Sequence, residues 1–303
     1  MSYIPGLVLK SQSGFFQVKT GTDVVVCSLR GKLKRGAHQG DLVAIGDRVL
    51  VSLITSKEGV IEAIEPRRCA ISRLDPRPQG IYEQVMLANP DQLLAVFACA
   101  QPAPHRRMLD RFLVIAEQQG IPAVIIANKC DLISRDEAEN LFGLYRPIGY
   151  QVIYTSARTG EGVEEVRNLL SNKVSALTGP SGVGKSSLIS CIQPDLNLRS
   201  AEISGATGKG RHTTEVRELH PLVGGGFVAD MPGLRALALW DLQPEELDGY
   251  FPEIRNLVNT CQYNNCSHRK EPGCSIRRAV EDGKVHPERY RSYLAMRFGD
   301  MEV

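Results

Sequence analysis

EGVEEVRNLLSNKVSALTGPSGVGKSS, residues 161–187, is the stretch that decides the fold of this chain. Its middle part, KVSALT, has the apolar and β-branched composition of a buried strand. The next eight residues, GPSGVGKS at 179–186, fit the phosphate-loop pattern G-x-x-x-x-G-K-[ST], and KSSLISCI after them is helix-like. A glycine-rich turn could match by chance, but strand before and helix after are the context that the motif requires. The stretch therefore predicts a nucleotide-binding α/β domain.

The residue types in this loop suit phosphate. Glycines let backbone N–H groups turn inward without a Cβ clash, and the following helix adds its partial positive charge. Lys185 would reach the β- and γ-phosphates, and the Ser186 hydroxyl would ligate Mg²⁺. The predicted phosphate-binding residues are Gly179, Pro180, Ser181, Gly182, Val183, Gly184, Lys185, Ser186 and Ser187.

Three further motifs resemble those of the translation-factor class of GTPases: NKCD at 128–131, TSA at 155–157 and DMPG at 230–233. By that resemblance, Asp131 accepts hydrogen bonds from guanine N1–H and the 2-amino group, which adenine cannot offer as a pair. Asn128 and Lys129 would brace the loop and cover the base, while Ser156-Ala157 would bring a backbone N–H towards O6. Asp230 and the Gly233 N–H would hold the Mg²⁺ shell and the γ-phosphate.

The order of these motifs is the reverse of that in an ordinary GTPase, where the phosphate loop comes first. Here the helix EGVEEVRNLL follows the TSA loop, and SNK alone joins it to the phosphate-loop strand. In the ordinary order that helix ends the domain beside the start of this strand, so a usual αβ connection can join the two. A domain whose termini lie close together tolerates circular permutation. The chain is therefore predicted to contain a circularly permuted P-loop G domain with a parallel-type sheet.

The rest of the chain divides around this domain. Residues 1–66 contain five β-rich segments with turn signals between them, which predicts a small OB-fold or SH3-like barrel. Residues 67–90 are predicted to be a linker, 91–238 the GTPase domain and 239–303 a C-terminal helical module. The barrel segment RGKLKRGAHQGD carries basic residues that could follow a phosphate backbone or simply form a solvated loop; they are Arg30, Lys32, Lys34 and Arg35.

The segment SGATGKGRHTTEVRE, 204–218, is predicted to be the first switch. Thr213 and Thr214 are both candidates for closing on Mg²⁺ and the γ-phosphate, and spacing does not choose between them. Many GTPases place a water-orienting Gln after DxxG, but this chain has Leu234 there. His212 is the candidate substitute, because imidazole can orient a water or accept its proton. The alternative is a loop histidine that faces solvent or a partner's RNA.

Three of the eight cysteines crowd together near the C-terminus, in TCQYNNCSHRKEPGC. Cys261, Cys266, His268 and Cys274 supply three thiolates and one imidazole, which suits one structural Zn²⁺ with no open position. A chance cluster of free thiols is the alternative. Arg269, Lys270, Arg277 and Arg278 lie around the cluster, and the basic helix VHPERYRSYLAMRF follows; these residues could contact RNA or form a solvated face.

The bulk composition excludes several protein classes. Lys and Arg total 36 against 34 Asp and Glu, so the net charge of +2 indicates no overall attraction to nucleic acid. The N-terminal MSYIPGLVLK lacks the features of a secretory signal, and the longest apolar runs are far shorter than a membrane span. Scattered cysteines suit reduced thiols, so a cytoplasmic location is predicted.

Taken together, the barrel, the order of NKCD, TSA, GPSGVGKS, RHTT and DMPG, and the Cys₃His cluster closely resemble the ribosome small subunit-dependent GTPase A (RsgA or YjeQ) family. The resemblance implies a monomeric bacterial GTPase that uses Mg²⁺, binds the small (30S) ribosomal subunit and its 16S rRNA late in maturation, and is stimulated by that subunit. An RNA-binding protein with an idle nucleotide pocket is one alternative, opposed by Lys185, Ser186 and Asp230. A P-loop kinase or ATPase is another, opposed by Asp131.

Overall fold

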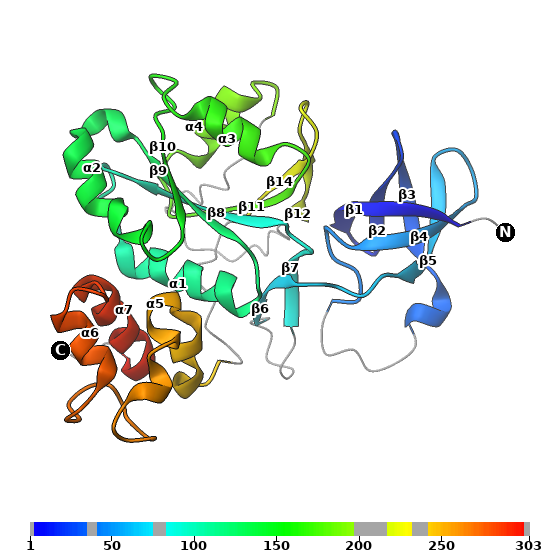
Figure 1. Ribbon diagram of the computed structural model, residues 1–303. Helices are drawn as coiled ribbons and strands as arrows, with labels where there is room; N and C mark the ends of the chain where they lie inside the picture. Colours follow the sequence, from blue (N-terminus) through cyan, green and yellow to red (C-terminus); the bar gives the residue numbers. More distant parts are fainter. Residues whose placement is uncertain (1–2, 35–40, 75–82, 197–216, 232–241, 300–303) are drawn as a thin grey trace, which may run out of the picture.

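The computed structural model describes residues 3–34, 41–74, 83–196, 217–231 and 242–299. The chain forms a small β-barrel, a central sheet covered by helices on both faces, and a helical C-terminal module (Figure 1). The barrel and the C-terminal module lie at opposite ends of the central domain, as Figure 1 shows. The two flanking modules can therefore reach surfaces that are far apart.

The barrel is built from β1 (Ile4–Gln12), β2 (Phe15–Thr20), β3 (Asp23–Leu29), β4 (Arg48–Leu53) and β5 (Glu58–Ile64). The strands follow one another in the order β1-β2-β3-β5-β4, and β4 pairs back with β1, which closes the sheet. Alternate side chains point inward, so that Val18, Val25 and Ile61 fill a core of their own. The five strands predicted from the sequence are thus confirmed.

The segment 67–90, predicted to be a linker, contains two paired strands instead. β6 (Ala70–Leu74) and β7 (Glu83–Ala88) form an antiparallel hairpin. Ile71 and Leu87 are fully buried in the same core cluster as the barrel residue Ile45. The sequence did not predict this hairpin, because the prolines and arginines obscure the strand pattern and the pairing is stabilised by burial between two domains.

The central sheet has the order β10-β9-β8-β11-β14-β13. Five strands are parallel, as predicted: β8 (Gln92–Ala98), β9 (Ala123–Asn128), β10 (Gln151–Tyr154), β11 (Val174–Thr178) and β14 (Phe227–Asp230). The edge strand β13 (His220–Pro221) is antiparallel to β14. β11, the phosphate-loop strand, lies between β8 and β14. The parallel strands bring the guanine loop and the phosphate loop to the same edge of the sheet.

Helices cover both faces of this sheet. α1 (Arg106–Gln118) packs on one face, and α3 (Val163–Leu170) and α4 (Lys185–Ile192) lie on the other (Figure 1). α2 (Arg135–Phe142) begins at a capping box formed by Ser134 and Glu137. Leu94 and Val96 of β8 face α3 and α4, whereas Leu93 and Phe97 face α1. Because both faces of the sheet are buried, its strands are apolar at successive positions.

The C-terminal module contains a 3₁₀ segment at Pro244–Tyr250 and the helices α5 (Pro252–Arg255), α6 (Ser275–Glu281) and α7 (Pro287–Phe298). Its core includes Phe251 and Tyr293, and Val114 of α1 belongs to the same cluster. Shared packing therefore attaches the module to the central domain. Among the described helices, none has the length and apolar character needed to cross a membrane.

Candidate guanine-nucleotide site and metal centre

The phosphate loop joins β11 to α4 and depends on glycines at two close approaches. Gly179 has φ +148°, and a Cβ added there would lie 2.0 Å from the Val96 carbonyl oxygen. Gly184 has φ +93°, and its added Cβ would lie 2.5 Å from Asn128 Nδ2. At both positions, the positive φ and the short contact exclude a residue with a side chain. The loop therefore keeps its backbone near the start of α4, where N–H groups can face phosphate oxygens.

Two side chains of the NKCD loop connect it to the phosphate loop. Asn128 is 1% exposed, and its Nδ2 donates to the Val183 carbonyl at 2.8 Å. Lys129 Nζ donates to the Gly182 carbonyl at 2.6 Å and also to the Gln101 carbonyl. The structure thus brings together two motifs that are separated by about fifty residues in the chain. Lys129 adopts a left-handed backbone with φ +60°, which directs this turn.

A cavity of about 370 Å³ lies between these loops. Its lining residues come from the NKCD loop, the TSA loop and the phosphate loop: Asn128, Lys129, Asp131, Leu132, Ala157, Arg158, Gly184 and Ser187. The volume is within the range of small-molecule sites. A purine bound there would have its recognition edge towards Asp131 and its phosphates towards Gly184.

Asp131 is held in place by two side chains. The Ser156 hydroxyl donates to Asp131 Oδ1 at 2.6 Å, and Arg158 Nη1 lies 3.7 Å from Oδ2. A carboxylate fixed in this way offers acceptors to a neighbouring pair of donors. Arg158 was not predicted from the sequence. It directly follows the TSA motif and is 81% exposed, so only its contact with Asp131 reveals it.

The described phosphate end contains Lys185 and the half-buried carboxylate of Asp230. Lys185 Nζ donates to the carbonyls of Gly179 and Pro180 at 2.9 and 3.0 Å. Burial raises the pKa of Asp230 above its ordinary value, and the Lys185 ammonium opposes that shift. Asp230 Oδ1 is buried and has no hydrogen-bond partner in the described part of the chain. An unpaired buried carboxylate oxygen fits a hydrated cation, so Asp230, with the half-buried Ser186 hydroxyl, suits Mg²⁺.

Several predicted site residues lie outside the described residues. These are the candidate water-positioning His212, the candidate magnesium ligands Thr213 and Thr214, and Gly233 of the DMPG motif, together with Leu234. Arg35 of the basic barrel segment also lies outside them. Of the other basic barrel residues, Arg30 is 3.4 Å from Glu62 and Lys32 is exposed.

The structure brings the four predicted zinc ligands together. The ligand atoms of Cys261, Cys266, His268 and Cys274 all lie within 4.8 Å of one another. His268 Nδ1 is 3.5 Å from Cys261 Sγ and 3.6 Å from Cys274 Sγ. Ligands around tetrahedral zinc are about 3.8 Å apart when Zn–S bonds are about 2.3 Å. The cluster therefore fits Zn²⁺ with His268 binding through Nδ1.

A carboxylate outside the cluster orients the histidine. Asp248 Oδ2 lies 3.4 Å from His268 Nε2, and Arg297 Nη1 donates to Asp248 Oδ1 at 2.5 Å. A carboxylate on the second imidazole nitrogen fixes the tautomer that binds metal. Asp248 was not predicted, because nothing in its local sequence distinguishes it. Its role depends on the packing of the 3₁₀ segment against α7.

Comparison with known proteins gives matches over the whole chain. The family described as RsgA GTPase matches residues 64–240, and the RsgA N-terminal domain matches residues 5–61. The small ribosomal subunit biogenesis GTPase RsgA of Gemmatimonas aurantiaca is 46% identical over 296 residues, which is 96% of each chain. The protein of the same name from Moorella thermoacetica is 43% identical over 289 residues, covering 95% of this chain and 94% of the relative.

Two solved structures share the fold. YjeQ from Thermotoga maritima superposes with a TM-score of 0.79 at 32% identity, covering 98% of both chains. YloQ, described as a circularly permuted GTPase, gives a TM-score of 0.75 at 31% identity over 98% of this chain and 94% of that one. With the site geometry and the two domain matches in agreement, the chain belongs to the RsgA family of circularly permuted GTPases and is a GTP-hydrolysing enzyme.

Proposed function

We propose that the chain hydrolyses GTP to GDP and phosphate on the small ribosomal subunit, late in the maturation of that subunit. The observation that carries the nucleotide part is the placement of Asp131 in a cavity shared with Gly184 and Ser187. Guanine recognition and phosphate binding then occur in one pocket. The ribosomal part is supported by the names of the relatives, small ribosomal subunit biogenesis GTPases.

Within this proposal, each described residue has a defined task. Asp131 accepts from the two guanine donors, and Ser156 keeps its carboxylate oriented. Asn128 and Lys129 hold the base loop against the phosphate loop. Lys185 exchanges its carbonyl partners for phosphate oxygens. When bound, Mg²⁺ would be held through Ser186, Asp230 and a first-switch threonine, Thr213 or Thr214, and would neutralise charge on the β- and γ-phosphates.

Water positioning is assigned to His212. The residue after DxxG is Leu234, which has no hydrogen-bonding group, so the water must be oriented by another side chain. Imidazole can accept a proton from water or hold it by a hydrogen bond. A site completed by docking on a partner gives slow hydrolysis alone and fast hydrolysis in the complex.

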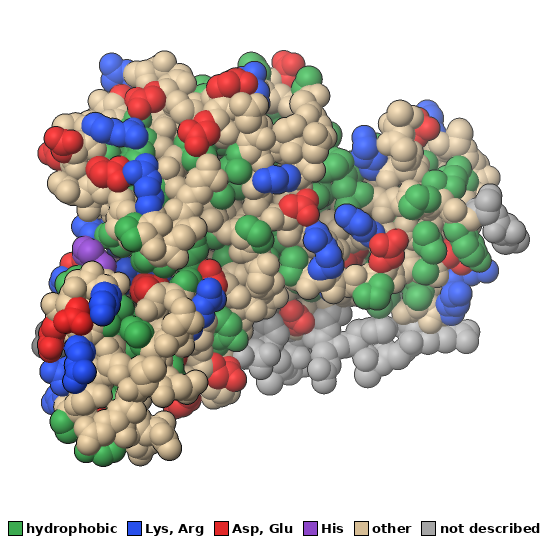
Figure 2. Space-filling view, viewed as in Figure 1, with side chains coloured by type: hydrophobic (Ala, Val, Ile, Leu, Met, Phe, Trp, Pro, Cys, Tyr) green, Lys and Arg blue, Asp and Glu red, His purple; other side chains and the backbone are tan. Residues whose placement is uncertain are grey.

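Contact with 16S rRNA is assigned to the two flanking modules, with the chain acting as a monomer in the cytoplasm. The barrel and the zinc module lie at opposite ends of the GTPase domain (Figure 1). Acidic and basic side chains are interspersed over the face in Figure 2, so RNA contact there would depend on local groups. Lys32 on the barrel and Lys270 and Arg278 beside the zinc cluster are exposed candidates.

The test is the GTPase rate of the zinc-loaded chain with and without purified small subunits. We expect slow turnover alone, strong acceleration by small subunits and none by large subunits. Equal use of ATP would favour a P-loop kinase or ATPase, and no turnover with small subunits would favour an RNA-binding protein with an idle pocket. Either result would contradict the proposal.

The His212 assignment has its own test in the same assay. His212→Ala should lower the stimulated kcat by about 100-fold, within the range of general-base effects, at unchanged GTP affinity. His286, which lies in the C-terminal module and accepts a hydrogen bond from the Glu288 N–H, provides the matched control, His286→Ala. Unaltered stimulated turnover in His212→Ala would remove this residue from the mechanism.

A further inference from the structure

The end of the predicted first-switch segment and the residues after it belong to two sheets at once. β12 (Arg217–Glu218) extends the barrel sheet by pairing antiparallel with β1, with Lys10 opposite Glu218 and Ser11 opposite Arg217. After the single residue Leu219, β13 pairs with β14 in the central sheet. We define residues 217–221 as the strap. It connects the barrel sheet to the strand that ends at Asp230.

The barrel end of the strap is held by several contacts. Lys10 Nζ donates to Glu218 Oε2 at 2.8 Å, and the two side chains are only 25% and 36% exposed. The Leu219 N–H donates to the Leu9 carbonyl at 2.7 Å. Leu219 itself is 1% exposed in a cluster that contains Leu9 and Ile45 of the barrel. The strap is thus attached to the barrel as well as to the central sheet.

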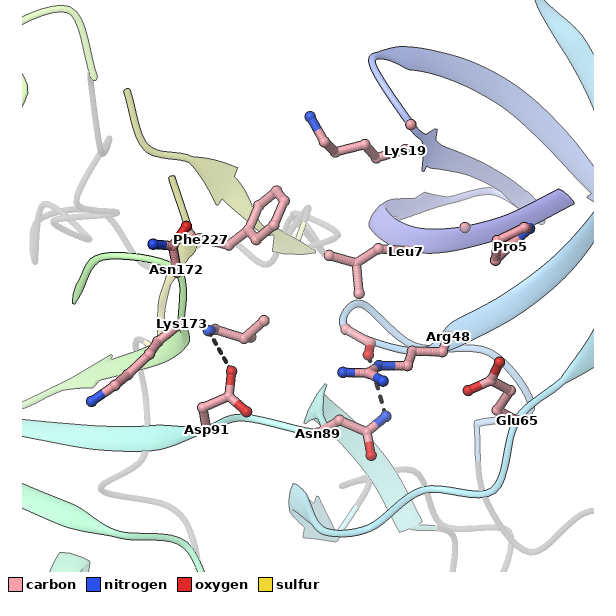
Figure 3. Close-up of a pocket in the computed structure, with 15 residues that line it drawn as sticks. Pro5, Leu7, Lys19, Arg48, Glu65, Asn89, Asp91, Asn172, Lys173 and Phe227 are labelled. Atoms are coloured by element: carbon pink, nitrogen blue, oxygen red, sulfur yellow. Dashed lines mark hydrogen bonds between the residues drawn. The ribbon is translucent and has the colours of Figure 1, made fainter. Parts of the chain in front are cut away.

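Beside the strap, the two domains do not fill the space between them. A cavity of about 520 Å³ is lined by Leu7, Lys19 and Arg48 from the barrel and by Asn172, Lys173 and Phe227 from the central domain (Figure 3). Lys19 Nζ lies 6.0 Å from the centre of the Phe227 ring. A displacement of the barrel is therefore not blocked by packing on this side. The strap and the β6–β7 hairpin both contact residues of the barrel and of the central domain.

The strap is connected to the nucleotide site through the central sheet. β13 is hydrogen-bonded to β14, whose last residue is Asp230. In the sequence, Arg217 also comes three residues after Thr214 and five after His212. The barrel therefore has a short path to the predicted magnesium ligand Asp230.

We infer that Lys10 and Glu218 are positioning residues, through which the barrel fixes the strap when it docks and so positions β14 and Asp230 for hydrolysis. The inference rests on the proposed stimulation by the small subunit. It assigns the Lys10–Glu218 contact to the stimulated kcat and not to nucleotide affinity, because the guanine loop and the phosphate loop make no described contact with the strap. The small subunit can shift the chain towards a hydrolysing state only through contacts that differ between that state and the resting state.

The experiment is a charge-reversal cycle: Lys10→Glu, Glu218→Lys and the double variant, each assayed for kcat and KM with and without saturating small subunits. In each single variant, the stimulated kcat should fall by a factor of about five or more, as expected for coupled sites. KM for GTP should stay within about twofold, since the pocket is untouched. The double variant should recover most of the stimulated kcat because the ion pair is rebuilt with its ends exchanged.

Lys57→Glu is the matched control, since it makes the same charge change at an exposed barrel site between β4 and β5. It should leave saturated, stimulated kcat unchanged. Equal losses in Lys57→Glu and Lys10→Glu, full activity of both single variants, or no recovery in the double variant would overturn the inference.

An amide hydrogen-exchange measurement on residues 217–222 needs no ribosome and separates the two proposals. Both single variants should exchange faster than the wild-type chain in this segment, and the double variant should approach it. If small subunits do not stimulate the wild-type chain, the proposed function fails. If neither single variant exchanges faster than the wild-type chain in this segment, the inference about the strap fails as well.

Discussion

At the residue scale, the most informative feature is the carboxylate of Asp131. This carboxylate lines the cavity; Ser156 donates a hydrogen bond to one of its oxygens, and the Arg158 guanidinium lies near the other. Guanine presents N1–H and an amino group side by side, which match one carboxylate. Adenine presents an acceptor at N1, which would leave that carboxylate unpaired. In the proposed function, discrimination between the bases thus depends on the orientation of this one side chain.

Asp131→Asn is expected to reverse this preference. GTP affinity should fall roughly 100-fold, or about 2.7 kcal/mol, while xanthosine triphosphate should gain affinity because its 2-oxo group accepts from the new amide. Competition binding with both nucleotides measures the change. Asp136→Asn, on the exposed first turn of α2, is the control with the same chemistry and should have no effect. Unchanged GTP preference in Asp131→Asn would exclude this residue from base recognition.

Local motifs explain why the nucleotide loops could be predicted from the sequence. GPSGVGKS and NKCD have short-range requirements, such as the left-handed glycine at 184, that are visible without the fold. By contrast, Arg158 and Asp248 depend on partners brought near by folding, and the sequence around them contains no signal. His212, Thr213 and Thr214 stay predictions at this scale.

At the element scale, α7 buries one of the basic residues that its sequence suggested would contact RNA or solvent. Arg289 is fully buried, with Nη1 2.6 Å from Asp110 Oδ1 of α1 and Nε 2.7 Å from Glu253 Oε1 of α5. Tyr145 also donates to Asp110 Oδ1 at 2.7 Å. The helix therefore uses its central arginine to attach the C-terminal module to the GTPase domain.

Replacing Arg289 with Met should cost about 3–5 kcal/mol of unfolding free energy, because Asp110 and Glu253 would stay buried without their partner. Arg291→Met is the matched control on the same helix. Arg291 is 55% exposed and, among the described residues, forms an ion pair with Glu288 alone, so its loss should change stability by less than about 1 kcal/mol. Urea denaturation followed by circular dichroism compares the two. Equal stabilities would show that the buried network does not hold the module.

The Cys₃His cluster, the predicted zinc site, is a second feature that belongs to this scale. Cys266→Ser should abolish binding of one zinc ion per chain and make the C-terminal module sensitive to protease, because metal binding and folding are coupled in such sites. GTP affinity should change by less than about twofold, since the pocket lies in another domain. Cys191→Ser, at an exposed cysteine of α4, should keep both zinc and protease resistance. Zinc retained by Cys266→Ser would contradict the ligand set.

Sequence periodicity predicted most elements but missed the shortest ones. The barrel strands and the alternating strands and helices from residue 91 onwards are long enough to show their periods. β12 and β13 have two residues each, and no pattern can appear in so short a segment. Their pairing results from tertiary contacts, as does the burial of Arg289 by Asp110, 179 residues away in the chain.

At the scale of the whole molecule, the order of the elements in the permuted chain determines which parts of the GTPase domain each flanking module contacts. The barrel pairs with the strap, which contains the end of the predicted first-switch segment, and the C-terminal module packs on α1, which follows β8. α1 is preceded by the loop containing Gln101, whose carbonyl accepts from Lys129 of the guanine loop. Each module therefore has a separate physical route to the nucleotide.

The same connectivity has a consequence for protein synthesis. β8, β9 and β10 emerge from the translating ribosome before β11, although β11 is the neighbour of β8 in the finished sheet. Until residues 174–178 emerge, the nascent chain presents one edge of β8 without its final partner, and every residue of that strand is buried in the folded protein. Such an edge favours mispairing. We therefore expect pauses in translation before Val174 to lower the yield of active protein.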